Sequence, residues 1–208
     1  PVADQVPAAP PQVGMDRRID TDRAGFASST LPQVVGTSDA SLHVVWQDYR
    51  GPQWSVYYRA LRNFGASIRD VEVPLSGTAN AQAPRIATDG DQLVYVTWHE
   101  FEDEDGRIMF ARSVDNGVSW TAPVQLNLTS GYASEPEICA DANGHVYVAW
   151  AQFDTVQDQI YLAVSPDGGQ TWNPQQRVNS IAVGHSEAPR LACDQNGKAW
   201  IAYLDRRF

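Results

Sequence analysis

Polar and charged side chains that could bind a ligand occupy matching places along this sequence. The first set directly follows a proline in each of four similar segments, and its members are Gln33, Arg85, Glu137 and Arg190. Guanidinium and carboxylate groups form charge-assisted hydrogen bonds, which suits them to polar ligands. Because these residues differ between otherwise similar segments, the repeat alone does not demand them. They are therefore candidates for ligand binding, with a solvated rim as the alternative.

A second set of candidates follows an aromatic residue in each segment. These positions hold Gln47-Asp48, His99-Glu100, Ala151-Gln152 and Leu204-Asp205-Arg206. The tentative ligand-binding residues are therefore Arg85, Arg190, Glu137, Asp48, His99, Glu100 and Asp205. The spacing of the four histidines matches neither a zinc site nor a catalytic triad, so no catalytic residue is assigned.

An acidic stretch from Glu102 to Gly106 is the one weak candidate for a metal site. Asp103 and Asp105 offer the oxygen ligands that Ca²⁺ favours, but the spacing is not that of an EF-hand loop. A solvated hairpin tip is the better interpretation. We therefore expect no cofactor and no metal, with Ca²⁺ at Asp103 and Asp105 as the alternative.

The two cysteines, Cys139 and Cys193, lie in corresponding strands of neighbouring segments, with Cys193 aligned to Ala140. Successive side chains of a strand point to opposite faces, so this offset of one residue could turn the two sulfurs toward each other. A disulfide is expected, and two buried free thiols are the alternative. A disulfide would indicate an extracytoplasmic compartment.

A repeat of 52 or 53 residues positions all these side chains. Its units begin at Pro32, Pro84, Pro136 and Pro189. A short apolar run follows each proline, then a turn signal such as Asn143-Gly144, then a second run ending in an aromatic residue. Two more short apolar runs complete each unit. Four antiparallel strands per unit predict a propeller blade, so we expect an all-β chain of about three and a half blades.

The turn between the third and fourth runs carries the sharpest motif, S-x-D-x-G-x-x-W. Its two copies are Ser113, Asp115, Gly117 and Trp120, and then Ser165, Asp167, Gly169 and Trp172. The Asp side chain can accept hydrogen bonds from backbone N–H groups just ahead of it, and the Gly tolerates positive φ. We expect the Trp to fold back over its own hairpin. A third, eroded copy places Leu61, Asn63, Gly65 and Ile68 at the same four positions.

This motif resembles the Asp box of the BNR-repeat, sialidase-like β-propeller superfamily, and the resemblance covers about residues 27–208. It implies that the Asp boxes lie at the blade periphery with a structural role. It also implies that ligands meet the ring where the inner strands begin and the second strands end, which is where both candidate sets fall. Sialidases bind a carboxylate with three arginines, the first in an F/Y-R-I/L-P motif. That motif is absent here, since Arg85-Ile86 and Arg190-Leu191 follow a proline, so hydrolase activity is not favoured.

The domain organisation follows from the repeat. Residues 1–14 are rich in Pro and Ala and are expected to be a leader or linker. Residues 15–208 are expected to form the propeller segment, with repeats near 27–79, 80–131 and 132–184 and a partial repeat at 185–208. Arg18-Ile19-Asp20-Thr21 resembles a fourth strand, and the last unit stops after its second strand. We therefore expect a second chain or a missing segment to complete the ring, with a self-closed four-bladed ring as the alternative.

Composition limits the partners. The net charge is −10, which argues against nucleic acid and anionic membranes, and no apolar run is long enough to span a bilayer. The sequence thus favours a secreted or cell-surface propeller that binds carbohydrate or protein without catalysis. A sialidase-like glycoside hydrolase and a purely structural module of a larger surface protein are the alternatives, because propellers host many functions.

Overall fold

The computed structural model describes residues 19, 28–62, 66–72, 80–90, 92–102, 105–129, 131–180, 184–194 and 196–206. Every regular element within these residues is a strand, so the predicted all-β class is confirmed. No helix in the described part of the chain is long and apolar enough to cross a membrane.

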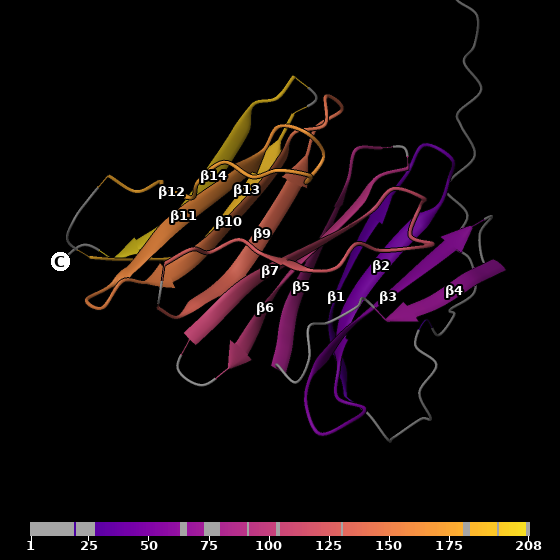
Figure 1. The fold of residues 1–208 in the computed structure, drawn as a ribbon, viewed down its shortest axis with the longest axis horizontal. Coiled ribbons are helices and arrows are strands. Elements are labelled where there is room, and N and C mark those ends of the chain that lie inside the picture. The colour runs from indigo at the N-terminus through magenta and orange to yellow at the C-terminus, as the bar shows by residue number, and fades with distance from the viewer. Residues whose placement is uncertain are drawn as a thin grey trace, which may run out of the picture.

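Fourteen strands form four antiparallel sheets, which we call blades 1 to 4 (Figure 1). Blade 1 contains β1 (Ser29–Gly36), β2 (Leu42–Asp48), β3 (Ser55–Arg62) and β4 (Ala66–Glu72). Blade 2 contains β5 (Asn80–Thr88), β6 (Val94–Glu102), β7 (Asp105–Ser113) and β8 (Val124–Gln125). Blade 3 contains β9 (Ala133–Ala140), β10 (Val146–Phe153), β11 (Asp158–Ser165) and β12 (Gln176–Arg177). Blade 4 contains β13 (His185–Cys193) and β14 (Ala199–Arg206).

Strand order equals chain order within each blade, so each blade is a meander. Short turns make this possible: Gly90, Gly144 and Gly197 have φ of 95°, 86° and 83° between the first and second strands. The sheets stand side by side like the leaves of an open fan, with blade 1 and blade 4 at its two ends (Figure 1). Stacked four-stranded meanders are the architecture of a β-propeller, as the repeat predicted.

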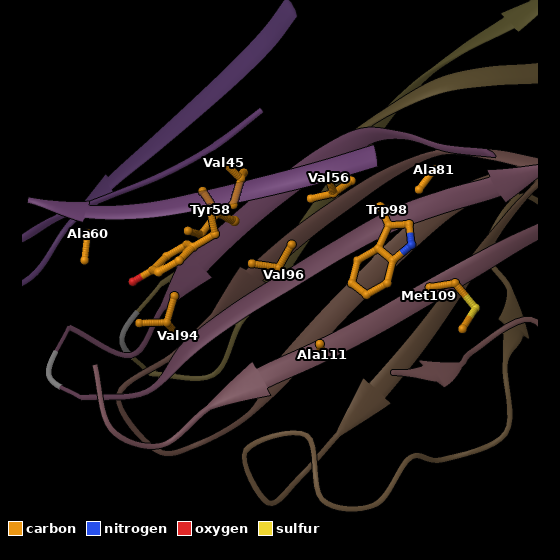
Figure 2. Close-up of a cluster of buried hydrophobic side chains, with 11 residues drawn as sticks. Val45, Val56, Tyr58, Ala60, Ala81, Val94, Val96, Trp98, Met109 and Ala111 are labelled. Atoms are coloured by element: carbon orange, nitrogen blue, oxygen red, sulfur yellow. The ribbon is translucent and has the colours of Figure 1, made fainter. Parts of the chain in front are cut away.

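Apolar faces of adjacent blades form the core. Between blades 1 and 2, Tyr58 and Val45 pack with Val96 and Trp98, all four fully buried (Figure 2). Between blades 2 and 3, Tyr95, Phe110, Val148 and Trp150 do the same, so the interface repeats every 52 residues. Burying such a side chain contributes about 1.5–3 kcal/mol, so each blade depends on its neighbours for stability.

Each inner strand carries a bulge that the sequence analysis did not predict. The pairing register shifts between Gln82 and Arg85 in β5, and at the same place in β1, β9 and β13. The residue before the repeat proline has positive φ in every blade, and these residues are Leu31, Ala83, Glu135 and Ala188. A bulge re-aims the next side chain. Here that side chain belongs to the first candidate set.

Two predictions about the strands differ from the structure or fall largely outside the described residues. The fourth strands of blades 2 and 3 are shorter than expected, because β8 and β12 span two residues each. The backbone of Leu126 and Val178 still donates to Ile108 and Ile160, which extends the contact with the third strand. Of the expected fourth strand at 18–21, all but Ile19 lies outside the described residues, as do Asn63 and Gly65 of the eroded motif.

Candidate functional site

One side of the molecule is where β5, β9 and β13 begin and where β6, β10 and β14 end. We call this side the upper face. Three of its candidate residues form one ionic group. Glu137 on β9 accepts a hydrogen bond from Arg85 Nε on β5 at 3.1 Å and another from Arg190 Nη1 on β13, also at 3.1 Å. The two guanidinium groups share the same carboxylate oxygen, Oε1. We call this group the arginine–glutamate bridge, and it joins blades 2, 3 and 4.

The bridge is partly accessible to solvent. The side chains of Arg85 and Glu137 are 19% and 14% exposed, whereas that of Arg190 is 66% exposed. Each arginine also donates to the carbonyl of the proline before it, Pro84 or Pro189. These bonds hold both side chains beside the bulge. Two guanidinium groups on one carboxylate give the bridge a formal charge of +1 in a protein whose net charge is −10.

His99 lies next to this bridge and is buried. Its ring is 4.2 Å from that of Phe101, measured between centroids, in an edge-on contact. Neither ring nitrogen has a hydrogen-bond partner among the described residues. Burial, with a smaller contribution from the positive charge of Arg85, lowers the pKa of His99 from 6.5 to about 4. The imidazole is therefore neutral at physiological pH.

Asp48 and Glu100 are placed differently from the expectation, because both carboxylates are fully buried. Trp46 Nε1 donates to Asp48 at 3.2 Å, and Trp98 Nε1 donates to Glu100 at 3.1 Å. Gln152 accepts the same bond from Trp150 at 3.0 Å. Side chains two residues apart on a strand share a face, so each acceptor satisfies its own tryptophan.

Among the described residues, no hydrogen bond or ion pair joins the remaining candidates to the arginine–glutamate bridge. Asp205 occupies the matching place on β14, two residues after Tyr203 and paired across the sheet with Ser186. Asp105 accepts a hydrogen bond from the backbone N–H of Gly131, and Asp103 lies outside the described residues. Within the part of the chain that the structure describes, no cluster of three or more His, Cys, Asp or Glu side chains could hold a metal ion.

The upper face also carries aromatic residues that the sequence analysis missed. Tyr49, Phe101 and Phe153 follow the second-strand acceptors of three blades at intervals of 52 residues. Tyr49 and Phe153 are 43% and 36% exposed. Tyr132, which is 41% exposed, stacks on Phe101 with ring centroids 5.2 Å apart. Their regular spacing was the signal that could have found them.

The two turns that resemble Asp boxes, 113–120 and 165–172, have one geometry. Asp167 Oδ1 accepts the backbone N–H of Thr171 at 2.8 Å, and Asp115 Oδ1 accepts that of Ser119 at 2.8 Å. Hydrogen bonds from the Thr171 side chain and backbone lower the pKa of Asp167 to about 2. All these polar groups serve the turn itself, as expected for a structural motif.

The tryptophans of these turns make ring contacts that the sequence analysis did not predict. Trp120 packs edge-on against Tyr58 of blade 1 at 4.9 Å, and Trp172 against Phe110 of blade 2 at 4.8 Å. Each tryptophan therefore packs on the third strand of the preceding blade. A Cβ on Gly117 would lie 1.7 Å from the Tyr58 hydroxyl, so this close approach requires glycine.

Cys139 and Cys193 form a disulfide with Cα atoms 5.9 Å apart. It joins the second-to-last residue of β9 to the last residue of β13, at the end of the inner strands opposite the upper face. Both cysteines line a cavity of about 430 Å³ that the inner strands of all four blades surround. The disulfide therefore ties blade 4 to blade 3 beside the axis of the molecule.

No protein-family model matches the chain, and no curated protein matches it in sequence. Among solved structures it is similar to a Hadza microbial sialidase, with a TM-score of 0.64, 14% identity and coverage of 85% of this chain and 44% of that one. It is also similar to an α-L-arabinanase of Penicillium chrysogenum complexed with arabinobiose, with a TM-score of 0.61, 14% identity, and coverage of 85% and 57%. An α-L-arabinofuranosidase of Fusarium graminearum with arabinobiose gives a TM-score of 0.61, 14% identity, and coverage of 85% and 56%.

These comparisons establish the fold. The chain has the β-propeller fold of these sialidase-like and arabinan-degrading enzymes. It spans about half the length of each of the three proteins, between 44% and 57%.

Proposed function

We propose that this chain is a carbohydrate-binding β-propeller that holds its ligand at the upper face without cleaving it. The observation that carries the proposal is the aromatic series Tyr49, Phe101 and Phe153, which recurs every 52 residues at that face. Aromatic rings have a negative face, which attracts the weakly positive C–H groups of a sugar ring. A side chain retained at one place in three blades, beside a cationic bridge, suits a ligand with both apolar and polar sides.

The polar half of such a site is the arginine–glutamate bridge. The Arg190 guanidinium group donates through Nη1 to Glu137 and to the Pro189 carbonyl, yet most of the side chain is exposed. A guanidinium group presents five N–H donors, so one that is bonded in this way retains donors for the hydroxyl groups of a sugar. Two of the structural neighbours are complexes with a carbohydrate, arabinobiose.

Hydrolysis is the weaker candidate. A sialidase-type reaction needs a tyrosine nucleophile with a glutamate partner. Among the described residues of the upper face, Tyr132 and Glu135 are a tyrosine and a glutamate that interact electrostatically. Burial, and then the negative charge of Glu135, raise the pKa of Tyr132, which disfavours the phenolate. The Glu135 carboxylate accepts the backbone N–H of Ala188 at 2.8 Å and is thereby held in the bulge of the next blade.

Isothermal titration calorimetry with arabinobiose and sialyllactose tests the proposal, using the Tyr49→Ala and Phe153→Ala variants. Loss of one anchor ring should weaken binding at least about tenfold, because an aromatic hot spot contributes about 2 kcal/mol. Val156→Ala is the matched control, since Val156 is 74% exposed and is not part of the aromatic series. Release of sugar from either compound by the wild-type protein would favour the hydrolase, and equal binding by all three variants would rule out this face.

Secretion to the cell exterior is part of the same proposal. The disulfide supports it, because disulfides persist in oxidising compartments.

A further inference from the structure

A small pocket lies at the upper face, on the outer side of blade 2. Its volume is about 170 Å³, and it lies between the start of β7 and the loop that leads from β8 into β9. A cavity of about 150 Å³ can hold benzene, so this pocket has room for one six-membered ring. The side chains that line it belong to Asp105, Arg107, Gln125, Asn127, Leu128 and Thr129. None of these residues is part of the arginine–glutamate bridge or of the aromatic series.

Two side chains of this pocket have hydrogen-bonding capacity that the fold does not use. Asp105 accepts the backbone N–H of Gly131 through Oδ1 at 3.3 Å, and its Oδ2 has no hydrogen-bond partner in the described part of the chain. Thr129 Oγ1 accepts from the side-chain amides of Gln152 and Gln175, at 2.8 and 3.1 Å. A hydroxyl group has two lone pairs and one proton, so the proton of Thr129 can still be donated. The pocket therefore offers an acceptor and a donor to a ligand that carries hydroxyl groups.

The charges around the pocket favour a ligand without a negative charge. Arg107 Nη2 lies 3.6 Å from Oε2 of Glu100, whose carboxylate is fully buried. These two charges offset each other, so Asp105 leaves the pocket with one formal negative charge. A like charge at this distance disfavours an anionic ligand. Leu128, which is 72% exposed, adds an apolar side that suits the C–H groups of a sugar ring.

Blade 3 shares the framework of this region but places different side chains on it. Asn127 and Asn179, which are 52 residues apart, each accept a backbone N–H from the third strand of their own blade. The residue that matches Arg107 in blade 3 is Gln159, which is fully buried and accepts a hydrogen bond from Asn179. The repeat therefore requires the asparagine but not the other residues that line the pocket in blade 2.

We propose that this pocket binds one uncharged sugar ring of the carbohydrate ligand and selects against sugar acids. Asp105 accepts hydrogen bonds from neighbouring hydroxyl groups of the ring, because a carboxylate can accept several at once. Thr129 donates to an oxygen of the same ring, and Leu128 packs on its C–H groups. This inference rests on the proposed function for taking the ligand to be a carbohydrate, and it adds a binding pocket and a class of sugar.

Amide chemical shifts in NMR titrations test the proposal. The neutral probes are the methyl glycosides of glucose, galactose, xylose and arabinose, and the anionic probe is N-acetylneuraminic acid. At least one neutral probe should shift the backbone amides of Gly106, Leu128 and Gly131, which border the pocket, whereas the anionic probe at the same concentration should not. Asp105→Asn keeps an oxygen for the Gly131 N–H but removes the charge. It should weaken binding of the neutral probe roughly fivefold, because charge-assisted hydrogen bonds are about twice as strong as neutral ones.

Asp154→Asn is the matched control, and it should bind every probe as the wild type does. Asp154 also holds a turn, since its Oδ1 accepts the backbone N–H groups of Val156 and Gln157, but it does not line the pocket. No pocket shift with any neutral probe, equal binding of the anionic probe, or wild-type affinity in Asp105→Asn would each overturn this inference. The proposed function would survive these results if Tyr49→Ala still weakened the binding of arabinobiose. Arabinobiose binding that shifts the pocket amides and is unaffected by Tyr49→Ala would instead refute the aromatic face and retain the pocket.

Discussion

Reduction of the Cys139–Cys193 disulfide should destabilise the protein strongly. The two cysteines are 54 residues apart in sequence. In the chain-entropy model, a cross-link that closes a loop of this length lowers the entropy of the unfolded chain by an amount worth about 4 kcal/mol at 25 °C. For a domain of this size, that free energy corresponds to a fall of roughly 8–16 °C in the unfolding temperature.

The assay is urea unfolding, followed by circular dichroism, of the wild-type protein with and without dithiothreitol. The midpoint should fall on reduction, and the Cys139→Ser, Cys193→Ser double variant should unfold at the lower midpoint under both conditions. Amides of β13 and β14 should lose protection from hydrogen exchange first, because the disulfide joins blade 4 to blade 3. An unchanged midpoint on full reduction, with both thiols titrated, would refute the reasoning.

Three further perturbations have defined outcomes. Gly117→Ala should lower the free energy of unfolding by about 1–3 kcal/mol more than Gly90→Ala does. Both glycines have positive φ, but only a Cβ at Gly117 meets Tyr58. Equal losses in urea unfolding would contradict this. The pKa of His99 is about 4 in the folded protein, against 6.5 for an ordinary histidine. The unfolded chain therefore binds the proton first, and the free energy of unfolding should fall by up to about 3 kcal/mol as the pH drops from 6.5 to 4. His99→Gln should remove this share of the pH dependence. Asn127 in the sequon Asn127-Leu128-Thr129 is 2% exposed and bonds Gly106 and Ile108 through its amide, so mass spectrometry of protein made in a glycosylating host should find it unmodified.

Much of the fold could be predicted because residues close together in the sequence determine it. The repeat prolines, the Asn-Gly turns and the terminal tryptophans fix the strands of each blade within the unit itself. Trp120 and Trp172, in the turns at 113–120 and 165–172, could not be placed in this way. Their ring contacts lie in another blade, and the distance between blades is not encoded by any single turn.

The candidate site shows the same division. The sequence placed Arg85, Glu137 and Arg190 at matching positions, but their shared hydrogen bonds depend on how adjacent bulges face one another. Asp48 and Glu100 looked like rim residues because they are charged and follow a strand. The tryptophan two residues earlier was the local signal that each carboxylate has a buried partner.

The contacts of Trp120 and Trp172 with the previous blade have a consequence for synthesis on the ribosome. Tyr58 gains its cover only when Trp120 has left the exit tunnel, and Phe110 waits in the same way for Trp172. Translation proceeds at roughly 5–20 residues per second, so a blade remains unsealed for some seconds after its own strands are complete. The chain should therefore fold in order from its N-terminus, with each newly made turn securing the blade made before it.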